Sequence, residues 1–464
     1  MKSIQKIILL SFIAILASCS KEPVFEADPF VVAFKDLSEK ISETTEVLLI
    51  YSETAPEDGE IIIEIATENA VYGRDFITIP EAVGNTLALD IVPGATNNSF
   101  EVIELNNAFT DVMEIEFTIS EVTITGSSIQ GYTSHKISDS AFLGGDFSPT
   151  VGGPNEPNQV YIDLSNDQET IVQRDTWDLG FYGGDEFRVG INGSIYMATA
   201  PLSTTDMNSV TSETVASMQS SVAVGTFNSE NINYIDAPNG DILETAIDEI
   251  SENDEENPVY LLNLGYEVGT AIPNTGSVAI AGDFRGWKKI RILRDSEDYI
   301  LQYADLDATS YNEITIAKDS NYNFTFFSFD KEATVAVEPE KLQWDLCFTV
   351  FTNVIGDSGS YGFSDYVTHN RKGGVTSYSI VDSEIAFEDF DYTDLDESLL
   401  QEAQNTIGDS WRNVFTRTVV DEIYYVLKDN NENYYKIRFL DLVSDSGERG
   451  YPRFEFYLLE EDEE

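Results

Sequence analysis

Short runs of alternating apolar and polar side chains occupy much of the chain. In the segment 113–119, MEIEFTI, the apolar Met113, Ile115 and Phe117 alternate with acidic and hydroxyl-bearing residues. A period of two residues is that of a β-strand with one buried face. Similar runs lie at 46–52, 60–66 and 99–105. Strands at this spacing predict a β-sandwich over residues 30–138.

The pattern stays β-rich through residues 139–464. In 186–198, EFRVGINGSIYMA, apolar positions alternate on both sides of Asn192-Gly193, a dipeptide that favours a two-residue hairpin. The segment 421–440 predicts another hairpin, with a longer polar loop. A larger, predominantly antiparallel β domain is therefore expected to follow the sandwich.

Helical patterns are scarce in this sequence. The best one covers 396–411, and a weaker one covers 205–219, with Asp206 as its N-cap. The fold class that we predict is all-β, with two domains and few helices.

The N-terminus, MKSIQKIILLSFIAILASCS, has the form of a secretory signal over residues 1–18. Lys2 and Lys6 precede an apolar run that is too short to span a bilayer. The segment 16–19, LASC, resembles a bacterial lipobox, which implies cleavage before Cys19 and lipidation of its thiol. A plain secretory signal with a chance cysteine is the alternative.

Residues 19–29 are polar and acidic, as expected of a tether behind a lipidated Cys19. Their SKEPVFEAD sequence resembles the export signals of surface lipoproteins of Bacteroidetes. The resemblance predicts a protein that the lipid anchors to the outer membrane and that is exposed at the cell surface.

The formal net charge of −57 limits the kinds of molecule that the protein can bind. A field of this sign repels phosphates, so nucleic acid is excluded as a partner. The charge is spread along the chain, which indicates a solvated acidic surface. Once Cys19 carries lipid, Cys347 has no cysteine to pair with, and alternation around it predicts a strand position.

One short phrase occurs twice: TWDLGF at 176–181 and QWDLCF at 343–348. Each places Trp, Leu and Phe on one face of a strand, with Asp on the other face. We interpret Trp177 and Trp344 as packing anchors of one core.

The phrases AVYGRDFITIP (70–80) and IVPGATNNSFEVIEL (91–105) resemble the Calx-β family of immunoglobulin-like sandwiches. Some domains of that family bind calcium through acidic loops. The resemblance makes Glu57, Asp58 and Asp75 candidate calcium ligands, whereas the simpler interpretation is a spacer that holds the second domain away from the membrane.

Residues from about 140 to the C-terminus resemble the HmuY-type haem-binding lipoproteins of Bacteroidetes. The phrases that carry this resemblance are PNEPNQVYIDLSN, RDTWDLGFYGGDEFRVGINGS, KLQWDLCFTVFTN, YGFSDYVTHNRKGGV, NYYKIRF and RGYPRFEFYLL. It implies an all-β domain that captures haem and delivers it to a TonB-dependent outer-membrane receptor.

Members of that family ligate haem through paired histidines or paired methionines. This chain has only His135 and His369, and His135 lies outside the similar region, which argues against a bis-histidine site. The candidate ligands in the matching interval are therefore His369, Met197, Met207 and Met218. Core packing is the simpler interpretation of the three methionines.

The surroundings of His369 suit a haem. Tyr366 and its aromatic neighbours offer an apolar wall, and Arg371 and Lys372 offer cations for the propionates. The same phrase recurs in the family where other residues ligate, so a purely structural loop is the alternative.

No arrangement of residues predicts an enzyme. Two distant histidines leave little for a catalytic triad, and no zinc spacing or phosphate-binding glycine loop occurs. The second hypothesis is a surface adhesion or glycan-binding lipoprotein, in which the first domain binds calcium and the second has no haem site.

Overall fold

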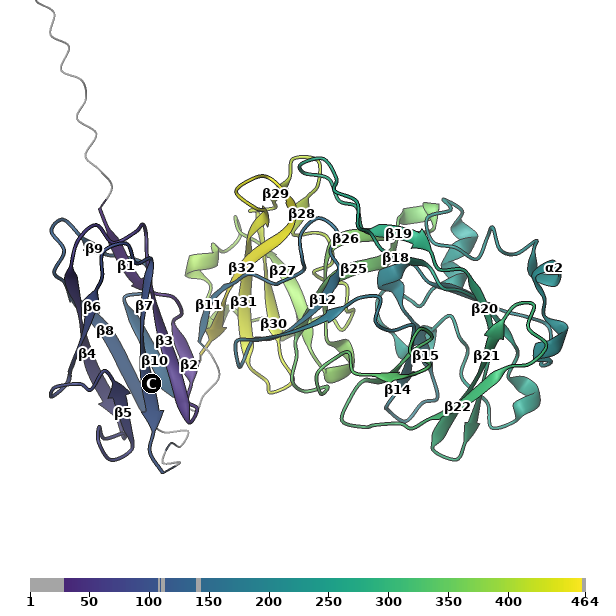
Figure 1. Cartoon of the computed structure of the whole chain (residues 1–464), viewed down its shortest axis with the longest axis horizontal. Coiled ribbons are helices and arrows are strands. Elements are labelled where there is room, and N and C mark those ends of the chain that lie inside the picture. The colour runs from purple at the N-terminus through teal and green to yellow at the C-terminus, as the bar shows by residue number, and fades with distance from the viewer. Residues whose placement is uncertain (1–28, 107–108, 110–112, 139–142, 461–464) are drawn as a thin grey trace, which may run out of the picture.

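The structure is a computed structural model (Figure 1), and it describes residues 29–106, 109, 113–138 and 143–460. The predicted signal peptide, Cys19 and most of the predicted tether lie outside the described residues. Within the described part of the chain, no helix has the length and apolarity needed to cross a bilayer.

Two five-stranded sheets form a sandwich from the first ten strands. One sheet has the order β5 (Phe76–Ile79), β7 (Asn97–Glu104), β3 (Thr44–Tyr51), β1 (Val31–Phe34) and β9 (Ser128–Ile129). The other has the order β2 (Ser38–Lys40), β10 (Ser134–Ser138), β8 (Glu114–Val122), β4 (Gly59–Glu68) and β6 (Thr86–Ile91).

Alternation explains how the sandwich closes. In β8, Ile115, Phe117 and Ile119 are buried between the sheets, and the residues between them are only partly buried. Each sheet thus contributes one apolar face to a single core.

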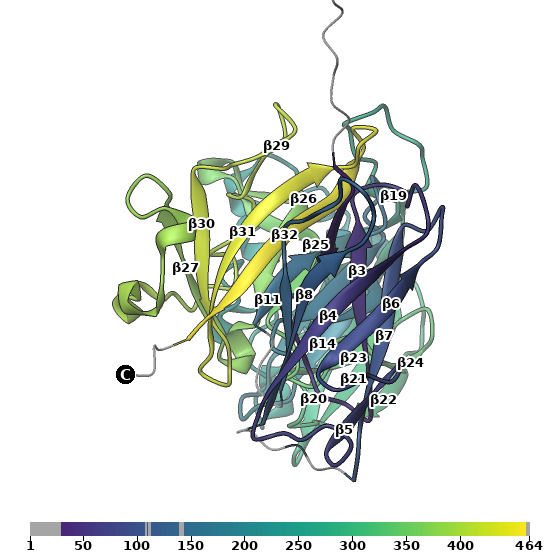
Figure 2. The same ribbon diagram turned by 90° about the vertical axis from the view of Figure 1, so that its left-hand side faces the viewer.

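The next sheet lies beside the sandwich (Figures 1 and 2). Its order is β11 (Gly144–Phe147), β32 (Arg449–Leu459), β31 (Tyr434–Val443), β30 (Ile423–Lys428) and β27 (Thr376–Val381). The hairpin predicted over 421–440 is confirmed, because Lys428 pairs with Tyr434 across the turn from β30 to β31. The Tyr132 and Tyr457 hydroxyls, 3.0 Å apart, join sandwich and sheet.

Two four-stranded sheets occupy the middle of the molecule. One has the order β13 (Gln168–Gln173), β12 (Asn158–Asp163), β25 (Leu346–Val354) and β26 (Ser360–His369). The other has the order β15 (Val189–Ile191), β14 (Leu179–Tyr182), β23 (Phe324–Ser328) and β24 (Ala333–Val335).

A five-stranded sheet lies at the far end from the sandwich (Figure 1). Its order is β16 (Ala198–Pro201), β17 (Tyr260–Asn263), β20 (Trp287–Asp295), β21 (Asp298–Asp305) and β22 (Asn312–Ile316). Two short ribbons complete the strands: β18 (Tyr266–Val268) with β19 (Ala281–Phe284), and β28 (Arg412–Asn413) with β29 (Thr418–Val419). The predicted all-β, mainly antiparallel fold is confirmed.

The helical elements of the described chain are short. They are α2 (Ser212–Val215) and the 3-10 turns η2 (Gly193–Ile195), η3 (Met207–Ser209), η4 (Ser229–Tyr234), η5 (Ile242–Glu244), η6 (Asp254–Glu256), η7 (Gly356–Ser358), η8 (Arg371–Gly373), η9 (Phe387–Asp389), η10 (Tyr392–Asp394) and η11 (Glu397–Leu399). Asp206 caps η3, because its side chain accepts a hydrogen bond from Asn208 N.

The prediction of a helix over 396–411 is wrong, and only η11 forms there. Backbone groups in the middle of the segment are hydrogen-bonded to other elements. Gln401 exchanges backbone hydrogen bonds with Ser377, and Gln404 N donates to Asn239 O. These partners interrupt a continuous helix, and only isolated turns form after η11. The helix predicted over 205–219 shrinks to α2 and η3.

The hairpin predicted at Asn192-Gly193 is also wrong. The Asn192 side chain accepts a hydrogen bond from Ser194 N and starts the turn η2. After that turn the chain enters β16, which pairs with β17 and not with β15. The asparagine acts here as a cap, the other role for which this residue type is favoured.

The repeated Trp-Asp phrase marks a structural repeat. The segment β12–β13–β14–β15–η2 has the same order of elements as β23–β24–β25–β26–η8. The first hairpin of each copy pairs with the other copy: Tyr161 of β12 lies opposite Cys347, and Phe326 of β23 lies opposite Gly180. The two copies have exchanged their hairpins.

The polar contacts repeat as well. Asp178 accepts a hydrogen bond from Phe329 N at 2.7 Å, and Asp345 accepts one from Leu164 N at 2.8 Å. Each carboxylate therefore holds the residue just after the hairpin strand that comes from the other copy.

An asparagine closes each repeat. Asn192 Nδ2 donates to the carbonyls of Arg174 and Trp177, at 2.7 and 2.8 Å. Asn370 Nδ2 donates in the same way to the carbonyls of Lys341 and Trp344, at 2.8 and 2.9 Å. Both asparagines are fully buried.

We predict that Asn370→Ala lowers the free energy of unfolding by about 3 kcal/mol, because two buried carbonyls lose their donor. Urea unfolding followed by tryptophan fluorescence measures this. The first of the four tryptophans is Trp177 and the last is Trp411, so the fluorescence signal comes from the part of the chain after the sandwich. The exposed Asn208 is the matched control, and Asn208→Ala should change the midpoint little. Equal midpoints for both variants would contradict the prediction.

Candidate functional site

A cavity of about 190 Å³ lies between the two four-stranded sheets, where the repeats face each other. Its aromatic lining residues are Tyr161, Trp177, Phe324, Phe326, Trp344 and Phe351. The tryptophans predicted as packing anchors therefore also form walls. Trp177 packs edge-on against Phe326 at 4.7 Å, and Trp344 packs edge-on against Tyr161 at 5.0 Å. These are equivalent pairs in the two repeats.

His369 lines this cavity from the end of β26. It is fully buried, with Nδ1 3.0 Å from Ser377 Oγ and Nε2 3.1 Å from the carbonyl oxygen of Glu402. Burial lowers the pKa of His369 to about 4, so the ring is neutral at neutral pH. His369 pairs with Leu346 as Ile191 pairs with Leu179 in the other repeat. The imidazole thus stands where the other copy has an apolar side chain.

The structure separates Met197 from the other two candidate methionines, Met207 and Met218, which pack in one cluster. Met197 lines the same cavity as His369, and its side chain also packs in the core that includes Ile195 and Leu262. Met207 belongs to a different buried cluster, together with Val210 and Leu261.

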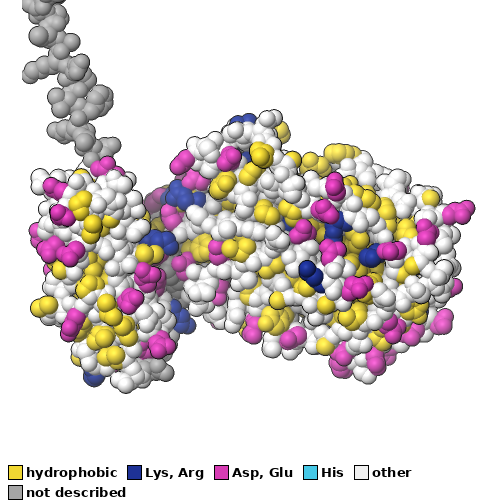
Figure 3. All heavy atoms as spheres, viewed as in Figure 1, with side chains coloured by type: hydrophobic (Ala, Val, Ile, Leu, Met, Phe, Trp, Pro, Cys, Tyr) yellow, Lys and Arg dark blue, Asp and Glu magenta, His cyan; other side chains and the backbone are white. Residues whose placement is uncertain are grey.

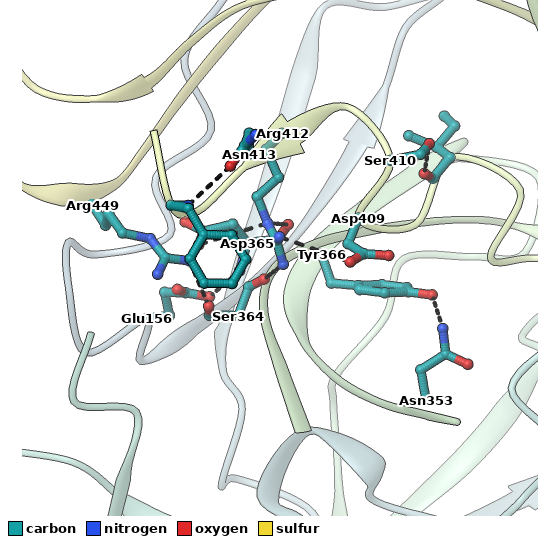
Figure 4. Close-up of polar contacts among 12 residues, drawn as sticks. Glu156, Asn353, Ser364, Asp365, Tyr366, Asp409, Ser410, Arg412, Asn413 and Arg449 are labelled. Carbon is teal, nitrogen blue, oxygen red and sulfur yellow. Dashed lines mark hydrogen bonds and ion pairs between the residues drawn. The ribbon is translucent and has the colours of Figure 1, made fainter. Parts of the chain in front are cut away.

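Tyr366 is not among the residues that line the cavity, and in Figure 4 its hydroxyl points toward Asn353. Its hydroxyl accepts a hydrogen bond from Asn353 Nδ2 at 2.7 Å, and its ring stacks on Phe351 at 4.6 Å. Tyr366 therefore supports Phe351, which lines the cavity, and is one layer removed from it.

A buried cluster of charges lies next to Tyr366 (Figure 4). The Asp365 carboxylate pairs with Arg449 and lies 3.9 Å from Arg412 Nε. Glu156 Oε2 accepts a hydrogen bond from Asp365 N, and burial raises the pKa of Glu156 well above its usual range. The cluster ties β26, β28 and β32 together at the side of the cavity wall.

The two cations predicted for propionates, Arg371 and Lys372, line the cavity at η8. In this structure a covering loop, residues 235–245, is bound to both of them. Arg371 Nη2 lies 3.2 Å from Asp241 Oδ2, and Lys372 Nζ donates to Gly240 O at 3.2 Å. Lys372 also lies over the Phe324 ring, 5.2 Å from its centroid.

Two acids in the lining, the buried Glu338 and the half-buried Asp236, were not anticipated from the sequence. Burial raises the pKa of Asp236 to about 6 and that of Glu338 to about 7. Asp236 accepts hydrogen bonds from Ile191 N and Ala246 N, both within 2.9 Å, and Glu338 accepts one from Phe324 N. Among so many acidic residues, only tertiary burial distinguishes these two.

Acidic side chains are spread over the visible face of the molecule, with few basic ones between them (Figure 3). This agrees with the predicted solvated acidic surface. Cys347 is buried in β25, and burial raises the pKa of its thiol well above its usual value.

The calcium ligands suggested for the first domain are not gathered into a site. The Asp75 carboxylate binds Arg74 and accepts a hydrogen bond from Val71 N, while Glu57 accepts one from Thr125 N. In the part of the chain that the structure describes, no three His, Cys, Asp or Glu side chains form a group that could hold a metal ion.

Comparison with known proteins agrees with the resemblance inferred from the sequence. The family model described as HmuY protein matches residues 155–311 and 320–456. No curated protein matches the chain.

Similar solved structures cover different parts of the chain. The apo HmuY analog of Tannerella forsythia is 9% identical, covers 69% of this chain and 97% of its own, and has a TM-score of 0.18. An apo-form Calx CBD1 domain is 14% identical, covers 24% of this chain and 97% of its own, and has a TM-score of 0.20. The Calx-β similarity is thus weak and partial, and TM-scores this low indicate neither ligand nor partner.

We predict that Glu338→Gln stabilises the protein above neutral pH. A carboxyl whose pKa is raised to about 7 on folding holds its proton more tightly in the folded state, so the free energy of unfolding falls as the pH rises from about 4.5 to 7. The substituted amide has no charge to bury, and the variant should exceed the wild type by about 2 kcal/mol at pH 8 and match it near pH 4.

Urea unfolding at the two pH values measures this difference. Glu340→Gln, at an exposed acid two residues away, is the control and should follow the wild type at both. A Glu338→Gln advantage that is equal at pH 4 and pH 8 would rule out titration of Glu338 as the cause.

Proposed function

The chain belongs to the HmuY family, and on this premise we propose that it binds haem at the cavity between its two repeats. One observation carries the proposal: the cavity brings an imidazole, a thioether, aromatic rings and two neighbouring cations to one place. These are the groups that protein haem sites use for the iron, the macrocycle and the propionates.

The donors have the chemistry that haem needs. The neutral His369 imidazole and the Met197 thioether are the candidate axial ligands, and Arg371 and Lys372 the candidate partners of the propionates. Haem, when bound, supplies an iron that accepts such ligands. His369 has to give up its contact with the Glu402 carbonyl before it can bind iron.

The volume of the cavity sets a condition on binding. A volume of about 190 Å³ is little more than the roughly 150 Å³ that holds a benzene in an engineered cavity. Pockets for larger organic ligands measure about 300–1,000 Å³. Haem binding therefore requires that the cavity widen, and the covering loop 235–245 is the part that has to move.

The cellular setting that we propose follows from the N-terminal sequence. A lipid on Cys19 anchors the protein to the outer membrane, and the sandwich over residues 30–138 holds the haem-binding domain away from the surface. Haem then passes to a TonB-dependent receptor. The family membership and the lipobox sequence support this setting.

Titration of the full mature chain with haemin tests the proposal. We expect a saturable Soret band that differs from that of free haemin. His369→Gln or Met197→Leu should change the position of the band, and Arg371→Gln should weaken binding about tenfold, the effect of losing roughly 1.4 kcal/mol.

Met207→Leu is the matched control for Met197→Leu, because both replace a buried thioether at similar volume and only Met197 lines the cavity. It should leave the spectrum unchanged. Absence of any spectral change beyond free haemin in the wild type would refute haem binding, and an effect of Met207→Leu alone would place the site elsewhere.

A further inference from the structure

The loop 235–245 closes the cavity mainly through polar contacts. Seven of its residues line the cavity, and its short turn η5 buries none of its side chains. Only Ile235 is a fully buried apolar anchor, and Leu243 is exposed. Little apolar surface has to be exposed when such a loop moves.

Arg371 and Lys372 hold the centre of this loop. Arg371 Nη1 donates to Asn239 O at 3.1 Å, and Arg371 Nη2 pairs with the Asp241 carboxylate. The Arg371 and Asp241 side chains retain 20% and 31% of their exposure, so water already reaches the pair. An ion pair of this kind adds little net stability.

Other contacts also fix the loop at its tip and at its base. At the tip, Gln404 N donates to Asn239 O at 2.9 Å, and Gln404 Nε2 donates to Pro238 O at 3.1 Å. The half-buried Asp236 carboxylate accepts hydrogen bonds from Ile191 N and Ala246 N at 2.8 and 2.9 Å, across the base of the loop. Gly240, at a positive φ of 77°, packs on the Gln404 side chain. The loop is therefore anchored at its base and latched at its tip.

We propose that Asp241 occupies the carboxylate-binding position of the cavity, and that a planar ligand bearing carboxylates enters by displacing the loop from Arg371 and Lys372. The inference rests on the proposed function and adds a selectivity to it. A ligand carboxylate replaces one ion pair by another and leaves no cation without a partner. A neutral ligand of the same shape would leave Arg371 only its longer contact with the exposed Glu402 carboxylate, at 3.7 Å.

Hydrogen–deuterium exchange of the ligand-free chain tests whether the Arg371–Asp241 ion pair holds the loop closed. Asp241→Asn should raise amide exchange in residues 235–245 severalfold, because the charge that holds Arg371 is gone. Glu244→Gln, which removes an exposed charge from the same loop, should leave exchange unchanged. Equal exchange in the wild type and Asp241→Asn overturns the inference.

Metal-free protoporphyrin IX and its dimethyl ester test the displacement without any contribution from iron. The free acid should raise exchange of 235–245 in the wild type and bind Asp241→Asn about tenfold more tightly, whereas the ester should do neither. An ester that opens the loop as well as the acid, or an acid that leaves it closed, overturns the inference. A different result separates this inference from the proposed function. If protoporphyrin binds as expected but the Soret band of haemin does not shift, only the proposed iron ligation is overturned.

Discussion

Two buried Asp–Asn sets, one in each repeat, hold the middle of this molecule together. The carboxylates of Asp178 and Asp345 each accept a backbone N–H from the hairpin of the other repeat. The amides of Asn192 and Asn370 each bind two carbonyls just before β14 and β25, respectively. Buried backbone groups without such partners cost about 1–3 kcal/mol each, so these side chains determine where each strand ends and which hairpin it pairs with.

The exchange of hairpins has a consequence for function. Because β12 pairs with β25 and β23 pairs with β14, each four-stranded sheet contains strands of both repeats, and the cavity between the sheets is lined by both repeats. Trp177 and Trp344 occupy equivalent positions of the two repeats in the cavity walls. The positions that give the cavity its chemistry break the symmetry of the repeats, as in the pair Ile191 and His369. The cavity thus lies between equivalent positions of the two repeats that carry different side chains.

The charges around the cavity determine which ligands it can bind. With 83 acidic and 26 basic side chains, the protein repels anions over most of its surface. Arg371 and Lys372 are neighbours at the cavity, and the covering loop supplies their counter-charge through Asp241. A carboxylate ligand therefore competes with the protein's own acid for the same guanidinium. Lys372 lies over Phe324 as well, which holds the cation at the aromatic wall.

The sequence by itself determined the all-β fold, through period-two alternation, and the family, through phrases such as QWDLCF and NYYKIRF. It also indicated Arg371 and His369, because cations and histidines are rare in this chain. It misjudged 396–411 and Asn192-Gly193, since local propensity for helix or hairpin gave way to backbone partners far along the chain. Only the tertiary structure decided that Met197 and His369 share a cavity while Met207 and Tyr366 do not. The raised pKa values of Glu338 and Asp236 could not be predicted from the sequence either. They come from desolvation, which depends on what packs around a side chain and not on its neighbours in sequence.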